Sequence, residues 1–240
     1  MASSTCLTLD LGNTSLKVLL WEQGAVIRRW RVFAVDAAKP GELPALEGVA
    51  EARGVRVPGR PEPILPPSWP EVLWAGDALL LPGSVQYRDP GEMGADRRVV
   101  AWGARALHGS ALVLDCGTAL TLTHVNEGGE IHGLGISIGF GALRQGLAQA
   151  APALSGFLSE EAPVPDGIPG GSAENLSLGT KMGWAGLLRQ LVREARTRLP
   201  HPGPLVLTGS DAPLAAELLG EGEIQPELLH IGLGTLERRT

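Results

Sequence analysis

The sequence contains only two cysteines, Cys6 and Cys116, and this scarcity excludes two classes of protein. Two thiols cannot build the disulfide framework of a small secreted scaffold, and by themselves they cannot complete a zinc site. Both lie in apolar, strand-like runs, so we expect buried, reduced thiols. The chain also lacks the charged start and apolar run of a signal peptide, and no apolar stretch is long enough to span a bilayer. We therefore expect a cytoplasmic protein with no membrane partner.

Positive charge is in the minority. The formal net charge is -6, and binding to a phosphate backbone needs clustered Lys and Arg, so we expect no nucleic-acid partner. The short basic run Arg28-Arg29-Trp30-Arg31 is better explained as the exposed face of a strand. A Gly-x-x-x-x-Gly-Lys-Ser/Thr sequence is absent too, which excludes a P-loop nucleotide site. Hydrophobic residues make up 44% of the chain and charged residues 19%, and both fractions are ordinary for a globular enzyme.

The most informative feature that is present is an internal repeat. The segment Leu7–Thr14 aligns with Leu112–Ala119, and in each copy an apolar strand leads into Asp, one residue, Gly and small polar side chains. Each copy continues as two more strand-like runs joined by a Gly-containing turn, so each predicts a three-strand meander. Because the copies match, we expect the two Asp-x-Gly loops to face each other and to bind the phosphates of ATP.

Helices and one more strand follow these meanders. Residues 36–70 are rich in Pro and Gly, which favours an irregular segment or a short strand. Helices are expected over residues 96–107, 141–154, 176–199 and 212–219. The apolar face of the third is expected to contain Met182, Leu188, Leu191, Val192, Ala195 and Leu199. A buried strand is expected over residues 204–208, and the turn Thr208–Asp211 after it is a strand-to-helix connection or one wall of an adenine pocket.

An Asp-x-Gly loop at the end of a buried strand suits a nucleotide site for physical reasons. Gly lets backbone N–H groups approach phosphate oxygens closely. The hydroxyls of Thr14 and Thr118 and the ammonium of Lys17 can add hydrogen bonds and charge. Carboxylates repel phosphates unless a cation intervenes, so Asp10 and Asp115 indicate metal ions. One copy alone would indicate a plain turn, whereas two copies in matching strand contexts favour a function.

A third motif lies between the two copies, in the segment Tyr87–Arg97. Asp96 and Arg97 begin a predicted helix, where an Asp suits the positive helix end. Taken alone, the motif is better explained by helix capping at Asp96 and a surface charge at Arg97. The functional alternative is that Asp96 accepts a proton from a substrate hydroxyl while the planar guanidinium of Arg97 binds a carboxylate.

In this order the motifs resemble those of the type III pantothenate kinases, the Bvg accessory factor family. The resemblance is carried by Asp10-Leu11-Gly12-Asn13-Thr14, Tyr87, Gly94-Ala95-Asp96-Arg97 and Asp115-Cys116-Gly117-Thr118-Ala119-Leu120-Thr121. It extends to residues 133–139, Ser172, Gly179, Gly183, Gly186 and residues 228–233, and is weak between residues 36 and 80. It implies an α/β fold of duplicated actin-like ATPase (ribonuclease-H-like) domains. Each would be a mixed sheet with a three-strand antiparallel meander and flanking helices, over residues 1–109 and 110–240.

The resemblance also implies a reaction, the ATP-dependent phosphorylation of the terminal hydroxyl of pantothenate, which is the first step of coenzyme A biosynthesis. Asp96 would be the general base, Asp115 would hold a monovalent cation (K⁺ or NH₄⁺), and Mg²⁺ would accompany ATP. ATP would contact Asp10, Leu11, Gly12, Asn13, Thr14, Ser15, Leu16, Lys17 and Thr118. Pantothenate would contact Tyr87, Gly94, Ala95, Asp96, Arg97 and Ser172. The enzyme would work as a homodimer, with dimer-forming helices in residues 110–240.

Several positions depart from the family pattern, namely Thr123 in place of Asp, Leu134 and Ile138 in place of Gly and Pro, and Ser172 in place of Thr. These departures support an alternative, a catalytically impaired member that acts as a regulatory or protein-interaction factor. A third hypothesis is a kinase or phosphatase of the same superfamily with a different acceptor, which the segment Tyr87–Arg97 disfavours. Because the three principal carboxylates remain, the active pantothenate kinase is the leading hypothesis.

Overall fold

The computed structural model describes residues 5–33, 43–158 and 164–239, and these form two compact units. Unit 1 comprises Met1–Gly109, Val125–His132 and Glu227–Thr240, and unit 2 comprises Ser110–His124 and Gly133–Pro226. The prediction of two homologous halves, 1–109 and 110–240, concerns the sequence repeat and stays a prediction.

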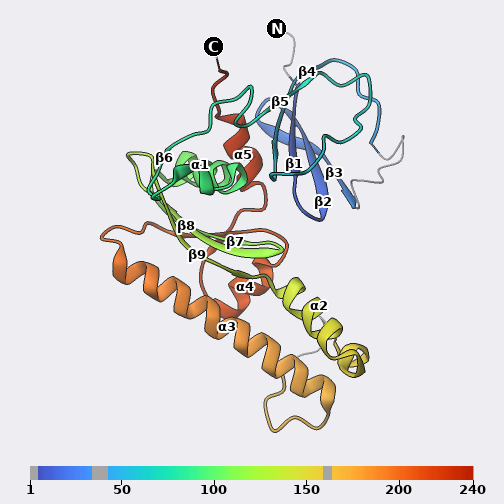
Figure 1. Ribbon diagram of the computed structural model, residues 1–240, viewed down its shortest axis with the longest axis vertical. Coiled ribbons are helices and arrows are strands. Elements are labelled where there is room, and N and C mark those ends of the chain that lie inside the picture. The colour runs from blue at the N-terminus through green and yellow to red at the C-terminus, as the bar shows by residue number, and fades with distance from the viewer. Residues whose placement is uncertain (1–4, 34–42, 159–163, 240) are drawn as a thin grey trace. The chain divides into compact units, whose positions relative to one another are not determined.

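Unit 1 is built on a five-stranded sheet with the order β3-β2-β1-β4-β5 (Figure 1). The strands are β1 (Thr5–Leu11), β2 (Ser15–Glu22), β3 (Ala25–Phe33), β4 (Val49–Arg56) and β5 (Val72–Trp74). The first three form the predicted antiparallel meander, and β4 and β5 add in parallel. Gln23 and Gly24 make the β2–β3 turn with φ values of 51° and 81°. The predicted irregular segment 36–70 contains β4, and its residues 36–42 lie outside the described part of the chain.

The alternation of side chains along β1 gives this sheet two different faces. One face is apolar and buried, and β1 contributes to it Leu7, Leu9 and Leu11. The other face carries Cys6, Thr8 and Asp10. The helix α5 (Leu228–Gly234) covers the middle of this second face, where His230 hydrogen-bonds to Thr8 (Nδ1 to Oγ1, 2.9 Å). The polar groups of β1 therefore lie in one row under α5.

The predicted helix 96–107 is confirmed as α1 (Ala95–His108), which packs on α5. Two glycines permit this close packing. A Cβ atom on Gly103 would overlap the carbonyl oxygen of Leu228, and one on Gly232 would overlap the carbonyl oxygen of Val99. Helix α5 is thus fixed between α1 and the polar face of the sheet.

Unit 2 contains most of a six-stranded sheet with the order β11-β10-β7-β8-β9-β6. Its strands are β7 (Ala111–Cys116), β8 (Ala119–Val125), β9 (Glu130–Ile138), β10 (Leu205–Thr208) and β11 (Glu223–Ile224). The consecutive strands β7, β8 and β9 are neighbours, which confirms the second meander, and β10 joins β7 in parallel. The first residues of β9 belong to unit 1, where they pair with β6 (Ser84–Val85).

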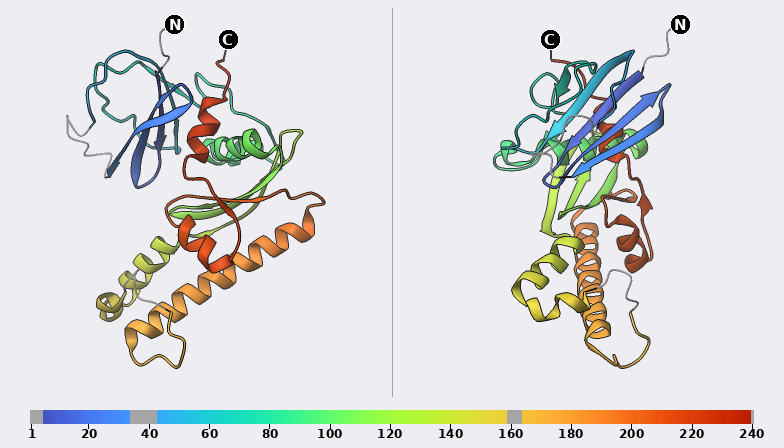
Figure 2. Two further views of the ribbon diagram at one scale, coloured as in Figure 1. Left: turned by 180° about the vertical axis from the view of Figure 1, so that it is seen from behind. Right: turned by 90° about the vertical axis from the view of Figure 1, so that its right-hand side faces the viewer.

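Helices α3 (Ser172–Arg198) and α4 (Ala212–Leu219) lie along one face of this sheet (Figure 2). The bounds of α4 agree with the prediction, and α3 begins four residues before its predicted start. The helix predicted over 141–154 is α2 (Phe140–Ala150), and a 3-10 helix, Pro152–Phe157, follows it. The α-helix ends there because the ring of Pro152 disfavours helical backbone at the residue before it.

The apolar face predicted for α3 is partly wrong. Leu188, Val192 and Ala195 are buried, but the side chain of Met182 is 46% exposed. Trp184 fills the core instead, packing on Phe140 with ring centroids 5.3 Å apart. Two residues along a helix turn a side chain by about 200°, so Met182 and Trp184 point in opposite directions.

Three smaller predictions concern thiols, charge and membranes. Cys116 is a buried free thiol as predicted, whereas Cys6 is free but only half-buried. The basic run on β3 is confirmed as exposed. Within the described ranges, no helix combines the length and the apolar character needed to cross a membrane.

Candidate functional site

The first Asp-x-Gly motif forms loop 1 (residues 10–15), between β1 and β2. The N–H of Gly12 donates to the carbonyl oxygen of Ser15 (3.1 Å), so these residues close a tight turn. Asn13 and Thr14 are exposed at its tip. Their backbone and side-chain groups are the ones that can meet a phosphate. Three of the residues predicted to contact ATP have buried side chains, so they can reach it only through the backbone: Leu11, Ser15 and Leu16.

Asp10 and Lys17 form an ion pair across the hairpin (Oδ2 to Nζ, 3.0 Å). They are direct cross-strand partners in β1 and β2, so the pairing register alone brings them together. The carboxylate side chain is 13% exposed and the lysine side chain 41%. A phosphate that approaches loop 1 therefore meets the ammonium group first.

Arg60 contacts loop 1, although no sequence motif indicates this residue. Its Nη2 donates to the carbonyl oxygen of Asn13, and the N–H of Val57 donates to that of Leu11 (3.1 Å). The reason is topological: β4 lies parallel to β1, so the residues after β4 emerge at the same edge of the sheet as loop 1. This arrangement adds a guanidinium group beside the tip of the loop.

Asp96 lies in the first turn of α1, half-buried in unit 1. Burial raises the pKa of its carboxyl group, the backbone N–H of Arg97 opposes this, and the negative charge of Asp10 raises the pKa further. The carboxylates of Asp10 and Asp96, which belong to the same unit, therefore interact electrostatically. A Cβ atom on Gly94 would overlap Asp96 Oδ1, so a side chain at position 94 would displace the Asp96 carboxylate. A carboxyl group with a raised pKa is suited to accept a proton near neutral pH.

The simple explanation of this motif by a cap and a surface charge is wrong for Arg97, whose residue is only 9% exposed. The N-cap of α1 is Gly94 rather than Asp96. The Nη1 group of Arg97 donates to the hydroxyl oxygen of Tyr87 (3.2 Å), which joins two of the predicted substrate residues. The next residue, Arg98, donates to the carbonyl oxygens of residues 81–83 and fixes the segment before Tyr87 on the helix. The start of α1 is thus a fixed, polar surface.

The second motif forms loop 2 (residues 115–119) in unit 2, with Thr118 exposed. The turn 208–211 lies directly beside it, since Asp115 and Thr208 are register partners in the parallel pair β7–β10. The N–H of Asp211 donates to the carbonyl oxygen of Cys116 (2.9 Å). Gly209 has a φ of +90°, and a Cβ atom there would press against the backbone of Cys116. This turn is therefore part of the wall of loop 2.

Helix α2 begins immediately behind loop 2. The N–H of Gly139, its N-cap residue, donates to the carbonyl oxygen of Thr118 (3.1 Å). The carboxylate of Asp211 accepts from the N–H of Gly141 (3.3 Å) and so meets the positive end of this helix. Burial first, then the charges of Asp115 and Asp211, raise the pKa of the Cys116 thiol, so both carboxylates lie near that thiol. The sequence showed Asp211 only as part of a turn.

Ser172 is the first residue of α3 and is exposed. Figure 1 shows the start of α3 beside the C-terminal end of α2, whereas loop 2 lies at the N-terminal end of α2. Unit 2 therefore does not bring Ser172 to loop 2, and its contact with a substrate stays a prediction.

Metal ligands are sparse in both loops. Across the described ranges, no group of three or more His, Cys, Asp or Glu side chains is arranged to hold a metal ion. Mg²⁺ in phosphoryl-transfer enzymes is held by one or two carboxylates together with the substrate phosphates. Single carboxylates such as Asp10 and Asp115 fit a cation that arrives with a nucleotide, and they do not form a protein-only metal site.

Comparison with protein families gives one match. The family model described as type III pantothenate kinase matches residues 64–194, more than half of the chain. The type III pantothenate kinase of Laribacter hongkongensis is 30% identical over 247 residues, which cover 97% of this chain and 98% of that protein.

Several solved structures share the fold, including the following two. A protein from Campylobacter jejuni, described as a Baf family transcriptional activator, aligns with a TM-score of 0.57 at 15% identity, covering 95% of each chain. The activator of 2-hydroxyisocaproyl-CoA dehydratase from Clostridium difficile, solved with bound ADPNP, aligns with a TM-score of 0.53 at 11% identity, covering 95% of this chain and 92% of that one. The predicted fold of duplicated actin-like domains is confirmed.

Proposed function

The chain belongs to the type III pantothenate kinase family, and we propose from this premise that it phosphorylates pantothenate with ATP, the first step of coenzyme A biosynthesis. The observation that carries the proposal is the half-buried Asp96, whose raised pKa suits a general base, beside Asp10 in the same unit. Action in the cytoplasm, where ATP is supplied, is part of the same proposal.

The chemistry follows from the positions of these groups. The substrate hydroxyl oxygen forms a bond to the γ-phosphorus of ATP as the bond from that phosphorus to the β-phosphate oxygen breaks, and Asp96 accepts the hydroxyl proton. Arg97, fixed by Tyr87, binds the carboxylate of pantothenate. Asn13 and Thr14 of loop 1 bind the phosphates together with Lys17 of β2. Catalysis then depends on orientation and charge neutralisation, because phosphoryl transfer needs little covalent help from the protein.

The two loop carboxylates, Asp10 and Asp115, are the proposed cation ligands. Asp10 would face the Mg²⁺ that arrives with ATP, Asp115 would hold a potassium or ammonium ion, and Thr118 would contact ATP. These ions supply positive charge against the phosphate oxygens.

A coupled ADP-release assay tests the function. ADP release should require pantothenate, should rise when potassium replaces a large organic cation, and should lose this potassium dependence in Asp115→Asn. A folded protein that forms no phosphopantothenate with any of several metal ions would instead support the regulatory alternative. Turnover with other alcohols but not with pantothenate would support a different acceptor.

We further propose that the protein is a homodimer that pairs through α3 and β9. The exposed glycines Gly179, Gly183 and Gly186 recur every three or four residues along α3, and a Cβ atom on any of them would meet nothing within 4 Å. Large apolar side chains are also exposed on these elements, with exposures of 46% for Met182, 68% for Ile136 and 41% for Ile138. A smooth helix face lets a second helix approach closely.

Gly183→Glu is expected to convert the dimer to a monomer, because a buried, unpaired carboxylate would enter the pairing surface. Light scattering coupled to gel filtration measures the mass. The matched control is Gly146→Glu in α2, which has equally open surroundings and should remain dimeric. A wild-type mass of one chain, or a Gly183→Glu dimer as stable as the wild type, would contradict the proposed surface.

A further inference from the structure

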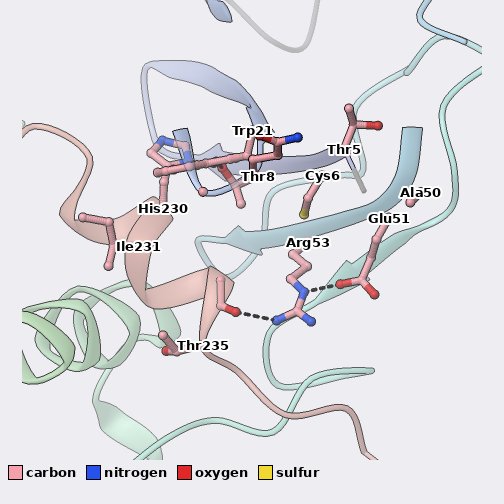
Figure 3. Close-up of a pocket in the computed structure, with 13 residues that line it drawn as sticks. Thr5, Cys6, Thr8, Trp21, Ala50, Glu51, Arg53, His230, Ile231 and Thr235 are labelled. Atoms are coloured by element: carbon pink, nitrogen blue, oxygen red, sulfur yellow. Dashed lines mark hydrogen bonds and ion pairs between the residues drawn. The ribbon is translucent and has the colours of Figure 1, made fainter. Parts of the chain in front are cut away.

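Unit 1 has a pocket at the opposite end of β1 from loop 1 (Figure 3). Its volume is about 580 Å³, within the range of small-molecule sites. It is lined by the start of β1, the β2–β3 turn with Trp21, the start of β4, and α5. Asp10, Lys17 and Asp96 do not line it. With about 3.3 Å of rise per residue, Cys6 in the pocket lies roughly 13 Å from Asp10.

One wall of the pocket is held by a chain of hydrogen bonds. The Nε1–H of Trp21 donates to Thr8 Oγ1 (2.7 Å), which lies 2.9 Å from His230 Nδ1. Burial is the main cause that lowers the pKa of His230 to about 4, so the ring is neutral near pH 7. A hydrogen bond to the backbone of Thr8 adds to this contact and opposes the effect of burial on the pKa of the ring. The His230 ring is therefore fixed against β1 and forms a neutral part of the wall.

The other wall is held by a network around Arg53. Its Nε group is ion-paired with Glu51, and its Nη1 group donates to the carbonyl oxygens of Leu233, Gly234 and Leu236 at the end of α5. Glu51 is also paired with Arg238. The three charged side chains carry one excess positive charge. The guanidinium of Arg53 is therefore fixed, and its Nη2 group has no protein partner in the described part of the chain.

The pocket thus offers a fixed, positively charged donor, Nη2 of Arg53, together with the ring of Trp21. A positively charged donor recognises a carboxylate, and the face of an indole recognises another flat ring. We propose that this pocket is a second binding site, which takes a small aromatic carboxylate with its ring on Trp21 and its carboxylate toward Arg53. The proposal does not depend on the kinase reaction, because none of the reacting groups lines the pocket.

Titration calorimetry with three probes on the wild-type protein tests the proposal. Benzoate has the ring and the carboxylate, benzyl alcohol has only the ring, and acetate has only the carboxylate. Benzoate is expected to bind at millimolar concentration or below, and each half-probe about tenfold more weakly or not at all. Saturating pantothenate and Mg-ATP should leave the benzoate affinity unchanged, since they occupy a different site.

Two variants locate the binding. Trp21→Leu should weaken benzoate about tenfold, whereas Trp30→Leu on β3, outside the pocket, should bind it as the wild type does. The comparison of probes on the wild type remains decisive where a variant folds poorly. No benzoate binding, equal binding of benzyl alcohol, or displacement by pantothenate would each overturn the proposal.

Discussion

Asp96→Asn is expected to lower kcat by a factor of about 10² to 10⁴, while the affinities for ATP and pantothenate stay nearly unchanged. The amide has the shape of the carboxylate but cannot accept the proton of the attacking hydroxyl. The side chain can keep its place, because the carbonyl oxygen of Asn can still accept from the backbone N–H of Arg97. Steady-state kinetics with both substrates, together with calorimetric binding, measures the two effects separately.

The raised pKa gives the same variant a second signature. Folding raises the pKa of Asp96, so the native state binds its proton more tightly than the unfolded chain does. The free energy of unfolding therefore falls as the pH rises from the unfolded pKa through the folded pKa. Asp96→Asn lacks this titration and should be at least as stable as the wild type at neutral pH. Wild-type kcat/KM should fall as the pH drops through a pKa above that of an ordinary Asp.

Asp89→Asn is the matched control. Asp89 is exposed seven residues earlier in the same segment, where its Oδ1 accepts from the N–H of Gly91 (2.9 Å) at the start of a 3-10 turn. Asn can accept the same hydrogen bond, so activity and stability should both remain. The assignment of Asp96 as the base fails if Asp96→Asn turns over at the wild-type rate. It also fails if lost activity follows from lost stability.

The two meanders and their loops could be predicted because their signals are local. Alternation along β1 and β7 identifies buried strands, and an Asp-x-Gly sequence at the strand end identifies the turn. Both motifs lie where these rules place them, at Asp10 and Asp115.

The residues that the sequence failed to indicate are brought to the loops by parallel strand pairing. Arg60 follows β4, and β4 lies beside β1 only because of a parallel crossover. Asp211 reaches loop 2 for the same reason, through the pairing of β10 with β7. A single sequence carries no local mark of such neighbours. The motif taken alone favoured a surface charge at Arg97, because its partner, Tyr87, belongs to a preceding loop whose path is not periodic.

Gly139→Ala is expected to disrupt loop 2. The residue has a φ of -70°, which alanine adopts without strain, so the effect comes from contact alone. A Cβ atom there would overlap the carbonyl oxygen of Gly117 and press on that of Thr118. Overpacking of this kind costs about 1–3 kcal/mol of stability. The displaced loop should also lower kcat/KM by about 10²-fold, because small errors of position weaken phosphoryl transfer.

Gly141→Ala, two residues further on, should have the opposite effect. A Cβ atom at Gly141 would meet nothing within 4 Å, and the residue lies inside α2, where alanine is favoured over glycine by about 0.5–1 kcal/mol. Urea unfolding and kcat/KM, measured on both variants, separate the two cases. If Gly139→Ala kept wild-type activity with reduced stability, loop 2 would tolerate displacement. The roles proposed for Asp115 and Thr118 would then be wrong, because a cation and a phosphate oxygen demand fixed ligands.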